Sequence, residues 1–68
     1  MSISEKIRLL LRRRKMTITE LAARLHLSRQ SVTKKLKDNH FTVAELQNIA
    51  AVLGCEIEIL FVDRGERL

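Results

Sequence analysis

The sequence predicts an all-α domain of four or five helices, followed by a single C-terminal β-strand. The 68 residues include no proline and only two glycines, so few positions interrupt a helix. Apolar residues recur at helical spacing between Ile3 and Leu53, and after Gly54 they alternate instead. Because a chain of this length buries only one small core, we expect one compact domain in residues 1–54.

The first helix is predicted from Ile3 to about Arg14. Ser2 can accept a hydrogen bond from the free N–H groups at the helix start, and Glu5 can complete a capping box three residues later. The apolar residues that share one face of this helix are expected to point inward: Ile3, Ile7, Leu10 and Leu11.

Residues 17–39 predict two short helices joined by a tight turn. Thr17 and Glu20 form a capping box for the first, and Ser28 caps the second, which covers about residues 29–38. Because only His26 and Leu27 separate them, the helices must cross steeply, as in a helix-turn-helix. The residues expected to point inward are Leu21, Ala22 and Leu25 on the first helix and Val32 and Leu36 on the second.

A fourth helix is predicted to begin after Thr42, which forms a capping box with Glu45. Gly54 is expected to end it, since glycine adopts the left-handed conformation that closes many helices. The inward residues of this helix are predicted to be Val43, Leu46, Ile49, Ala50 and Leu53.

Residues 55–62 predict a β-strand, and residues 63–68 a polar tail. One face of the strand carries Cys55, Ile57, Ile59 and Phe61, and the other carries Glu56, Glu58, Leu60 and Val62. No second strand is visible in the sequence, so we expect the strand to pair with its own copy and form a homodimer. The predicted dimerisation residues are Ile57, Ile59 and Phe61. The alternatives are a strand-like tail packed on its own helices, or an edge for a different protein.

Charge is distributed unevenly along the chain. Residues 1–40 contain eleven Lys/Arg and three Asp/Glu, whereas residues 41–68 contain two and five. A basic N-terminal part indicates contact with phosphates, although ordinary solvated helix faces are the alternative. For the run from Arg12 to Lys15 that alternative is preferred, because basic residues commonly close a helix at its C-terminal dipole. The only aromatic residues, Phe41 and Phe61, argue against stacking platforms for single-stranded nucleic acid.

Several classes of protein are disfavoured by the inventory of residues. The sequence has no apolar run of roughly 18 residues and no signal sequence, so we expect no membrane contact and a cytoplasmic, nucleoid-associated protein. Cys55 is the single cysteine, and the two histidines show no metal-ligand spacing, so no metal or other cofactor is expected. Paired carboxylates and a glycine-rich phosphate loop are also missing, which argues against an enzyme.

The chain resembles the Cro/C1-type (XRE) helix-turn-helix family of bacterial and phage regulators from about Ser2 to Gly54. The residues that carry the resemblance are Leu21-Ala22, the turn His26-Leu27-Ser28, and Val32. The chain departs from the family pattern at three places: His26, where members often have Gly; Leu11 with Leu36, where several have a buried Arg–Glu pair; and Ile18, where Gln often contacts phosphate. The resemblance implies a transcriptional regulator that binds double-stranded DNA.

The second helix of this motif is then the recognition helix. Arg29 can donate two hydrogen bonds to guanine, Gln30 can pair with adenine, and Lys34 can reach guanine acceptors. The resemblance implies the same three residues, and Thr33 shares their outer face. The residues predicted to contact DNA phosphates are Thr17, Ser28, Ser31, Lys37, Asn39 and His40. For Lys37, Asn39 and His40 the alternative is an ordinary solvated surface residue.

Together these features predict a homodimeric repressor that binds a pseudo-palindromic operator through the major groove. Repression is preferred to activation because no segment of the sequence is left for an effector pocket or an activating domain. The alternative is an antitoxin, or another phage or plasmid regulator, that also inhibits a protein partner such as a toxin or a phage or host protein. RNA binding is less favoured, because A-form RNA closes its major groove to side chains.

Overall fold

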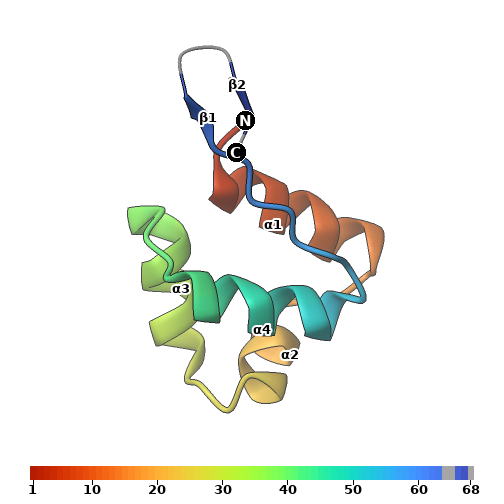
Figure 1. Ribbon diagram of the computed structural model, residues 1–68. Helices are drawn as coiled ribbons and strands as arrows, with labels where there is room; N and C mark the ends of the chain where they lie inside the picture. Colours follow the sequence, from red (N-terminus) through yellow and green to blue (C-terminus); the bar gives the residue numbers. More distant parts are fainter. Residues whose placement is uncertain (64–65, 68) are drawn as a thin grey trace.

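The computed structural model describes residues 1–63 and 66–67, and four helices lie in that part of the chain (Figure 1). The helices are α1 (Ile3–Arg13), α2 (Ile18–Arg24), α3 (Arg29–Asp38) and α4 (Val43–Leu53). They are followed by two short strands, β1 (Val62–Asp63) and β2 (Glu66–Arg67). The predicted four-helix, mostly helical architecture is therefore confirmed.

Each helix begins at the predicted cap. Ser2, Thr17 and Thr42 each accept the backbone N–H of a glutamate three residues later, and that glutamate accepts the N–H of the cap in return. Ser28 caps α3 by accepting the N–H of Ser31 at 3.1 Å. These contacts satisfy backbone donors that have no partner inside a helix, so the four starting points are fixed locally.

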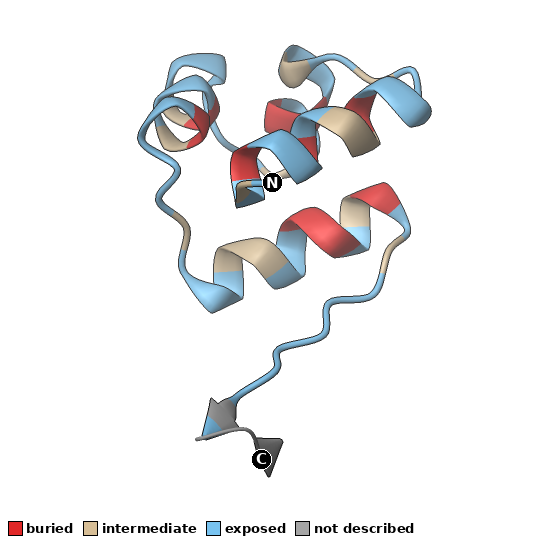
Figure 2. Cartoon of the chain, turned by 90° about the horizontal axis from the view of Figure 1, so that it is seen from above, coloured by how far each residue is buried: buried red, intermediate tan, exposed pale blue. Residues whose placement is uncertain are grey.

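The core lies where the four helices meet (Figure 2). Leu21 is completely buried at its centre, and α1 contributes Ile7 and Leu11. Leu36 packs in the same cluster as Leu11, so an apolar pair fills the place of the ion pair found in several family members. The buried cluster consists of Ile7, Leu11, Leu21, Ala22, Val32, Leu36, Ile49 and Leu53.

Two residues predicted to point inward do not do so. Ile3 is 41% exposed and Val43 is 49% exposed. Each is the first residue of its helix, α1 and α4 respectively. The apolar stripe of a helix can be covered only as far as its neighbours extend, and the first residue of each of these helices lies at the margin of the core.

The C-terminal strand differs from the prediction. Residues 55–61 form no strand, and only Val62 of the predicted segment belongs to one. Val62 and Asp63 pair antiparallel with Arg67 and Glu66, so the expectation that the chain has no second strand was wrong. The sequence signal is a two-residue spacer, Arg64-Gly65, in which only the glycine is a residue type favoured in short hairpin turns. Residues 64, 65 and 68 of the predicted polar tail lie outside the described residues.

Candidate nucleic-acid interface

Helix α3 presents two different faces. Val32 and Leu36 are 2% and 3% exposed and anchor one face in the core. The opposite face carries the predicted base-contacting residues, all of them exposed. With Lys37 and Asp38 they line one shallow groove along the helix: Arg29, Gln30, Thr33 and Lys34. The structure thus brings these five predicted DNA contacts together on a single surface.

The turn before α3 is closed by backbone hydrogen bonds. Leu27 N–H donates to Ala22 O at 2.9 Å, and His26 N–H donates to Ala23 O at 3.2 Å. This pattern requires a left-handed residue after the helix, and His26 supplies it with φ of 58°. His26 therefore adopts the left-handed conformation for which other family members often use Gly, at a modest conformational cost.

Two hydrogen bonds tie the end of α3 to the beginning of α1. The Ser4 hydroxyl is buried and donates to Leu36 O at 2.7 Å. Ser4 N–H donates to Asn39 Oδ1 at 2.9 Å. Because Asn39 uses its side-chain oxygen in this way, it holds α1 against α3 in addition to its predicted role at a phosphate.

An ion pair joins the back of α3 to α4. Lys35 Nζ contacts a carboxylate oxygen of Glu45, and each of the two side chains is less than one-third exposed. The Lys35 hydrogen bond, together with the backbone N–H of Thr42, lowers the pKa of Glu45 from 4.5 to about 2. Lys35 is therefore compensated within the domain and is less available to DNA than the outer lysines.

Charge on the outer face of α3 is not fully compensated. Lys34 lies 3.8 Å from Asp38, but both side chains are well exposed, so this pair is weak. Among the described residues, neither Arg29 nor Lys37 forms an ion pair. A phosphate backbone would therefore meet two free cations and one partly screened cation on this face.

The predicted phosphate contacts are less closely grouped. Ser31, half-buried, and His40 line a second hollow beside the groove of α3. Ser28 accepts the N–H of Ser31, which leaves its own O–H free to donate. Thr17 stands apart at the start of α2, where its hydroxyl contacts the Glu20 carboxylate at 3.1 Å. A carboxylate at that point opposes phosphate binding. Asp38 also lines the hollow of Ser31 and His40, but there Lys34 lies 3.8 Å from its carboxylate.

Sequence reasoning missed the residues that hold this surface from behind. Ser4 and the Lys35–Glu45 pair carry no local signal, because the partners lie on different helices and not three or four positions apart on one. Arg14 was assigned to the end of its own helix, yet its Nε donates to Leu53 O at 2.9 Å, at the end of α4. Arg14, alone of the basic run, thus donates to the C-terminal end of a neighbouring helix, where a cation is favoured by the helix dipole.

A comparison with protein-family models agrees with the geometry. The model of the Cro/C1-type HTH DNA-binding domain matches residues 6–64, most of the chain. The chain belongs to the Cro/C1-type family. The family assignment makes the exposed face of α3 part of a DNA-binding domain. Neither the curated proteins nor the solved structures contain a significant match.

Three further features complete this Cro/C1-type domain. Ile18, which replaces the Gln common in the family, packs half-buried against the core instead of facing solvent. Within residues 1–63 and 66–67, no three His, Cys, Asp or Glu side chains are arranged to hold a metal ion. In that same part of the chain, every helix is too short or too polar to cross a membrane.

Proposed function

We propose that this Cro/C1-type domain is a homodimeric transcriptional repressor that binds a pseudo-palindromic operator in double-stranded DNA. The observation that carries the proposal is the outer face of α3, where five polar or basic side chains are exposed while Val32 and Leu36 fix the helix from behind. A helix of this kind fits the major groove of B-form DNA, whose base edges carry a distinct pattern of donors and acceptors.

The residues on this face take different roles in the proposal. Arg29, Gln30, Thr33 and Lys34 read base edges, with Arg29 and Gln30 at the end of the helix that enters the groove first. Lys37 and His40, with Ser28, Ser31, Asn39 and Thr17, contact the phosphate backbone. The free cations Arg29 and Lys37 supply most of the electrostatic attraction, because Lys35 is paired with Glu45.

Dimerisation is inferred from the C-terminal segment. No backbone hydrogen bond joins residues 56–61 to the rest of the described chain. Ile59 and Phe61 are 54% and 65% exposed, which is costly in a single chain. A second copy pairing along this edge would satisfy the backbone and cover both side chains. Two recognition helices held about 34 Å apart would then read two half-sites.

Repression in this proposal is steric. A dimer bound over a promoter prevents polymerase from occupying the same DNA, which requires only tight and selective binding. The protein would therefore act at the nucleoid, in the cytoplasm.

The test is selection of binding sites from a random duplex library, at about 150 mM salt so that non-specific phosphate contacts are suppressed. We expect enrichment of an inverted repeat with half-site centres about one helical turn apart. The matched control is Arg24→Ala, an exposed arginine on α2 outside the α3 groove, which should enrich the same sequence. Arg29→Ala should enrich a repeat that is degenerate at one position of each half-site.

Other outcomes would change the proposal in defined ways. A single half-site would retain DNA binding and contradict the dimer. A complete lack of enrichment would contradict operator binding and favour the second candidate, a regulator that inhibits a protein partner. The exposed apolar side chains of Leu60 and Phe61 favour that candidate, because a different protein could cover them as well as a second copy does.

A further inference from the structure

Residues 56–61 of the C-terminal segment form no backbone hydrogen bond with the other residues that the structure describes, and their side-chain pattern restricts how two copies can meet. We propose that two copies pair antiparallel in one register, with Ile59 of each copy opposite Ile59 of the other on the twofold axis. This inference rests on the homodimer proposed above and specifies its geometry.

Symmetry limits the possible registers. Two identical antiparallel strands are related by a twofold axis perpendicular to their sheet, and residues directly opposite each other project from the same face. Side chains alternate between the faces, so a residue can stand opposite only a residue an even number of positions away. Every allowed register therefore places one residue opposite its own copy.

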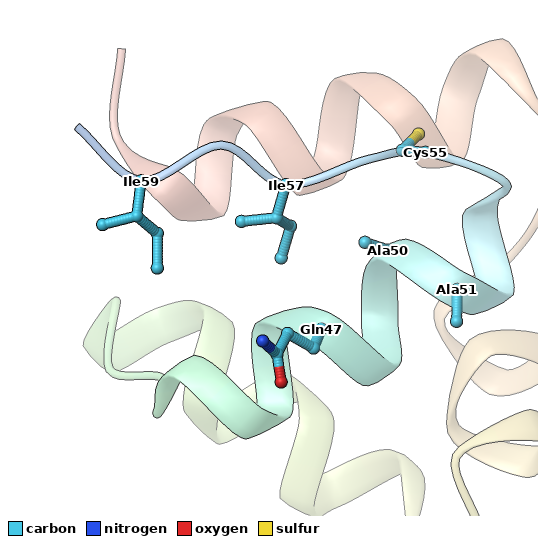
Figure 3. Close-up of a pocket in the computed structure, with 6 residues that line it drawn as sticks. All are labelled: Gln47, Ala50, Ala51, Cys55, Ile57 and Ile59. Carbon is cyan, nitrogen blue, oxygen red and sulfur yellow. The ribbon is translucent and has the colours of Figure 1, made fainter.

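The segment is extended enough for this reasoning to apply. In Figure 3, Ile57 and Ile59 project to the same side of the chain, toward α4, where Gln47 and Ala50 lie. The hollow between them is lined by these four residues with Ala51 and Cys55. Ile57 and Ile59 thus share a face that is directed to α4, as the alternation of the sequence predicts for these two residues.

Charge eliminates the neighbouring registers. With Glu58 on the axis, two carboxylates stand directly opposite each other, and with Ile57 on the axis Glu56 stands opposite Glu58. With Leu60 on the axis, Ile57 stands opposite Asp63.

A further register, with Phe61 on the axis, places Ile59 opposite Asp63 and so sets a carboxylate against an apolar side chain in the middle of the segment. With Ile59 on the axis, Asp63 instead stands opposite Cys55, at the end of the segment. With Ile59 on the axis, Ile57 stands opposite Phe61 and Glu58 opposite Leu60. Among these five registers, only this one meets two conditions together. It pairs Ile57, Ile59 and Phe61 exclusively with apolar residues of the other copy, and it places no glutamate opposite another glutamate.

The hairpin indicates which backbone groups the second copy would meet. Asp63 and Glu66 flank the two-residue spacer, and such a hairpin closes on a pair that exchanges both backbone hydrogen bonds. When the alternation of a strand is continued from Asp63 back along the chain, the backbone groups of odd-numbered residues face the β2 side, and those of Glu58 and Leu60 face the other edge. In the proposed register Glu58 and Leu60 exchange hydrogen bonds across the axis. Ile59 and its copy form a non-hydrogen-bonded pair, with Cα atoms about 4.5 Å apart.

This geometry can be tested by disulfide cross-linking of the full chain. In a Cys55→Ser background, Ile59→Cys, Glu58→Cys and Leu60→Cys are each oxidised with glutathione disulfide, and the rate of covalent dimer formation is compared. Residues on the axis have Cβ atoms close enough for a disulfide, whereas the copies of Glu58 or Leu60 are diagonal neighbours about 7 Å apart. We expect Ile59→Cys to cross-link at least tenfold faster. All three positions are exposed, so the substitutions leave the helical core intact.

A second measurement uses a mixture of the Ile57→Cys and Phe61→Cys chains, one of which carries a mass tag. The register predicts that the mixed disulfide forms in preference to either self-disulfide. Faster cross-linking of Glu58→Cys or Leu60→Cys, with a dimeric mass before oxidation, would overturn the register and leave the dimer intact. A monomeric mass for the unmodified protein by sedimentation equilibrium, with equally slow cross-linking at every position, would overturn the register and the proposed dimer together. DNA binding by a monomer would remain measurable in that case.

Discussion

At the scale of single residues, the four helix ends share one device. Each ends with a left-handed residue, at Lys15, His26, Asn39 and Gly54, and the following N–H donates back to the last turn of the helix. Only one of the four is glycine. The other three adopt this conformation at a cost in free energy. At Asn39 the hydrogen bond that its Oδ1 accepts from Ser4 N–H offsets that cost.

Lys15→Gly is therefore expected to stabilise the fold. Glycine removes a left-handed strain of about 1–2 kcal/mol, but it also makes the unfolded chain more flexible, which costs about 0.4–1 kcal/mol. The free energy of unfolding should therefore rise by about 0.5–1 kcal/mol. Urea unfolding at fixed protein concentration, followed by circular dichroism, measures it. Lys15→Ala removes the same charge and keeps the strain, so equal stability of the two variants would contradict the explanation.

Arg29 and Lys37 should behave differently when removed. Arg29→Ala is expected to cost roughly 1–3 kcal/mol on the operator and to relax preference at one base pair, because it removes a bidentate contact to a base. Lys37→Ala should weaken all sequences alike and reduce the slope of log K against log salt by about one. Titrations on operator and random DNA at several salt concentrations separate these effects. Equal losses for Arg29→Ala on both DNAs would contradict its role as a reader.

At the scale of secondary-structure elements, α3 is positioned by contacts from two other helices. Ser4 holds its C-terminal end through Leu36 O, and Glu45 holds its middle through Lys35. These polar contacts set the orientation of the helix around its own axis more tightly than apolar packing alone, because hydrogen bonds are directional. The direction in which the reading face points therefore depends on residues outside that face.

Ser4→Ala is expected to lower the free energy of unfolding by about 1 kcal/mol, since the buried bond to Leu36 O is lost. Urea unfolding checks this value. Thr19→Ala, an exposed hydroxyl on α2, is the control and should change stability by no more than about 0.5 kcal/mol. If both substitutions have the same small effect, the Ser4 bond does not stabilise the packing of α1 on α3.

The Lys35–Glu45 pair predicts a pH dependence of stability. The pKa of Glu45 is about 2 in the folded chain and near 4.5 when unfolded, so the folded state favours the ionised form. Its stabilisation is complete above about pH 4.5 and is lost as the pH falls toward 2. Comparing urea midpoints between pH 7 and pH 2.5 tests this. Lys35→Met removes the largest cause of the shift and should make the stability curve flatter in that range.

At the scale of the whole molecule, a basic reading surface and an apolar C-terminal edge occupy separate parts of the chain. The first lies on α3, and the second lies beyond α4, along α1 and α4 (Figures 1 and 2). This separation allows a second copy to bind without covering the DNA-binding face. It also means that substitutions can weaken assembly while the helical domain stays folded.

Phe61→Ser is expected to reduce the dimer fraction while helix content stays constant, because Phe61 is 65% exposed in the single chain. Sedimentation equilibrium and circular dichroism measure the two properties in one sample. The control is Val43→Ser, which replaces an exposed apolar side chain at the start of α4, outside the C-terminal segment. It should leave the mass of the protein in solution unchanged. A dimeric mass for Phe61→Ser would exclude this side chain from the interface.

The sequence by itself determined the helix starts and ends, the steep helix-turn-helix crossing, and which face of α3 is directed outward. These features depend on residues three or four positions apart, whose relation is fixed by the helix itself. Only the tertiary structure decided that Ser4 bonds to Leu36, that Arg14 closes α4, and that the first residues of α1 and α4 remain uncovered. The two hydrogen bonds join residues more than 30 positions apart, whose meeting is set by the packing of the whole core and leaves no periodic signal in the chain. The exposure of the two first residues likewise depends on how far the neighbouring helices extend.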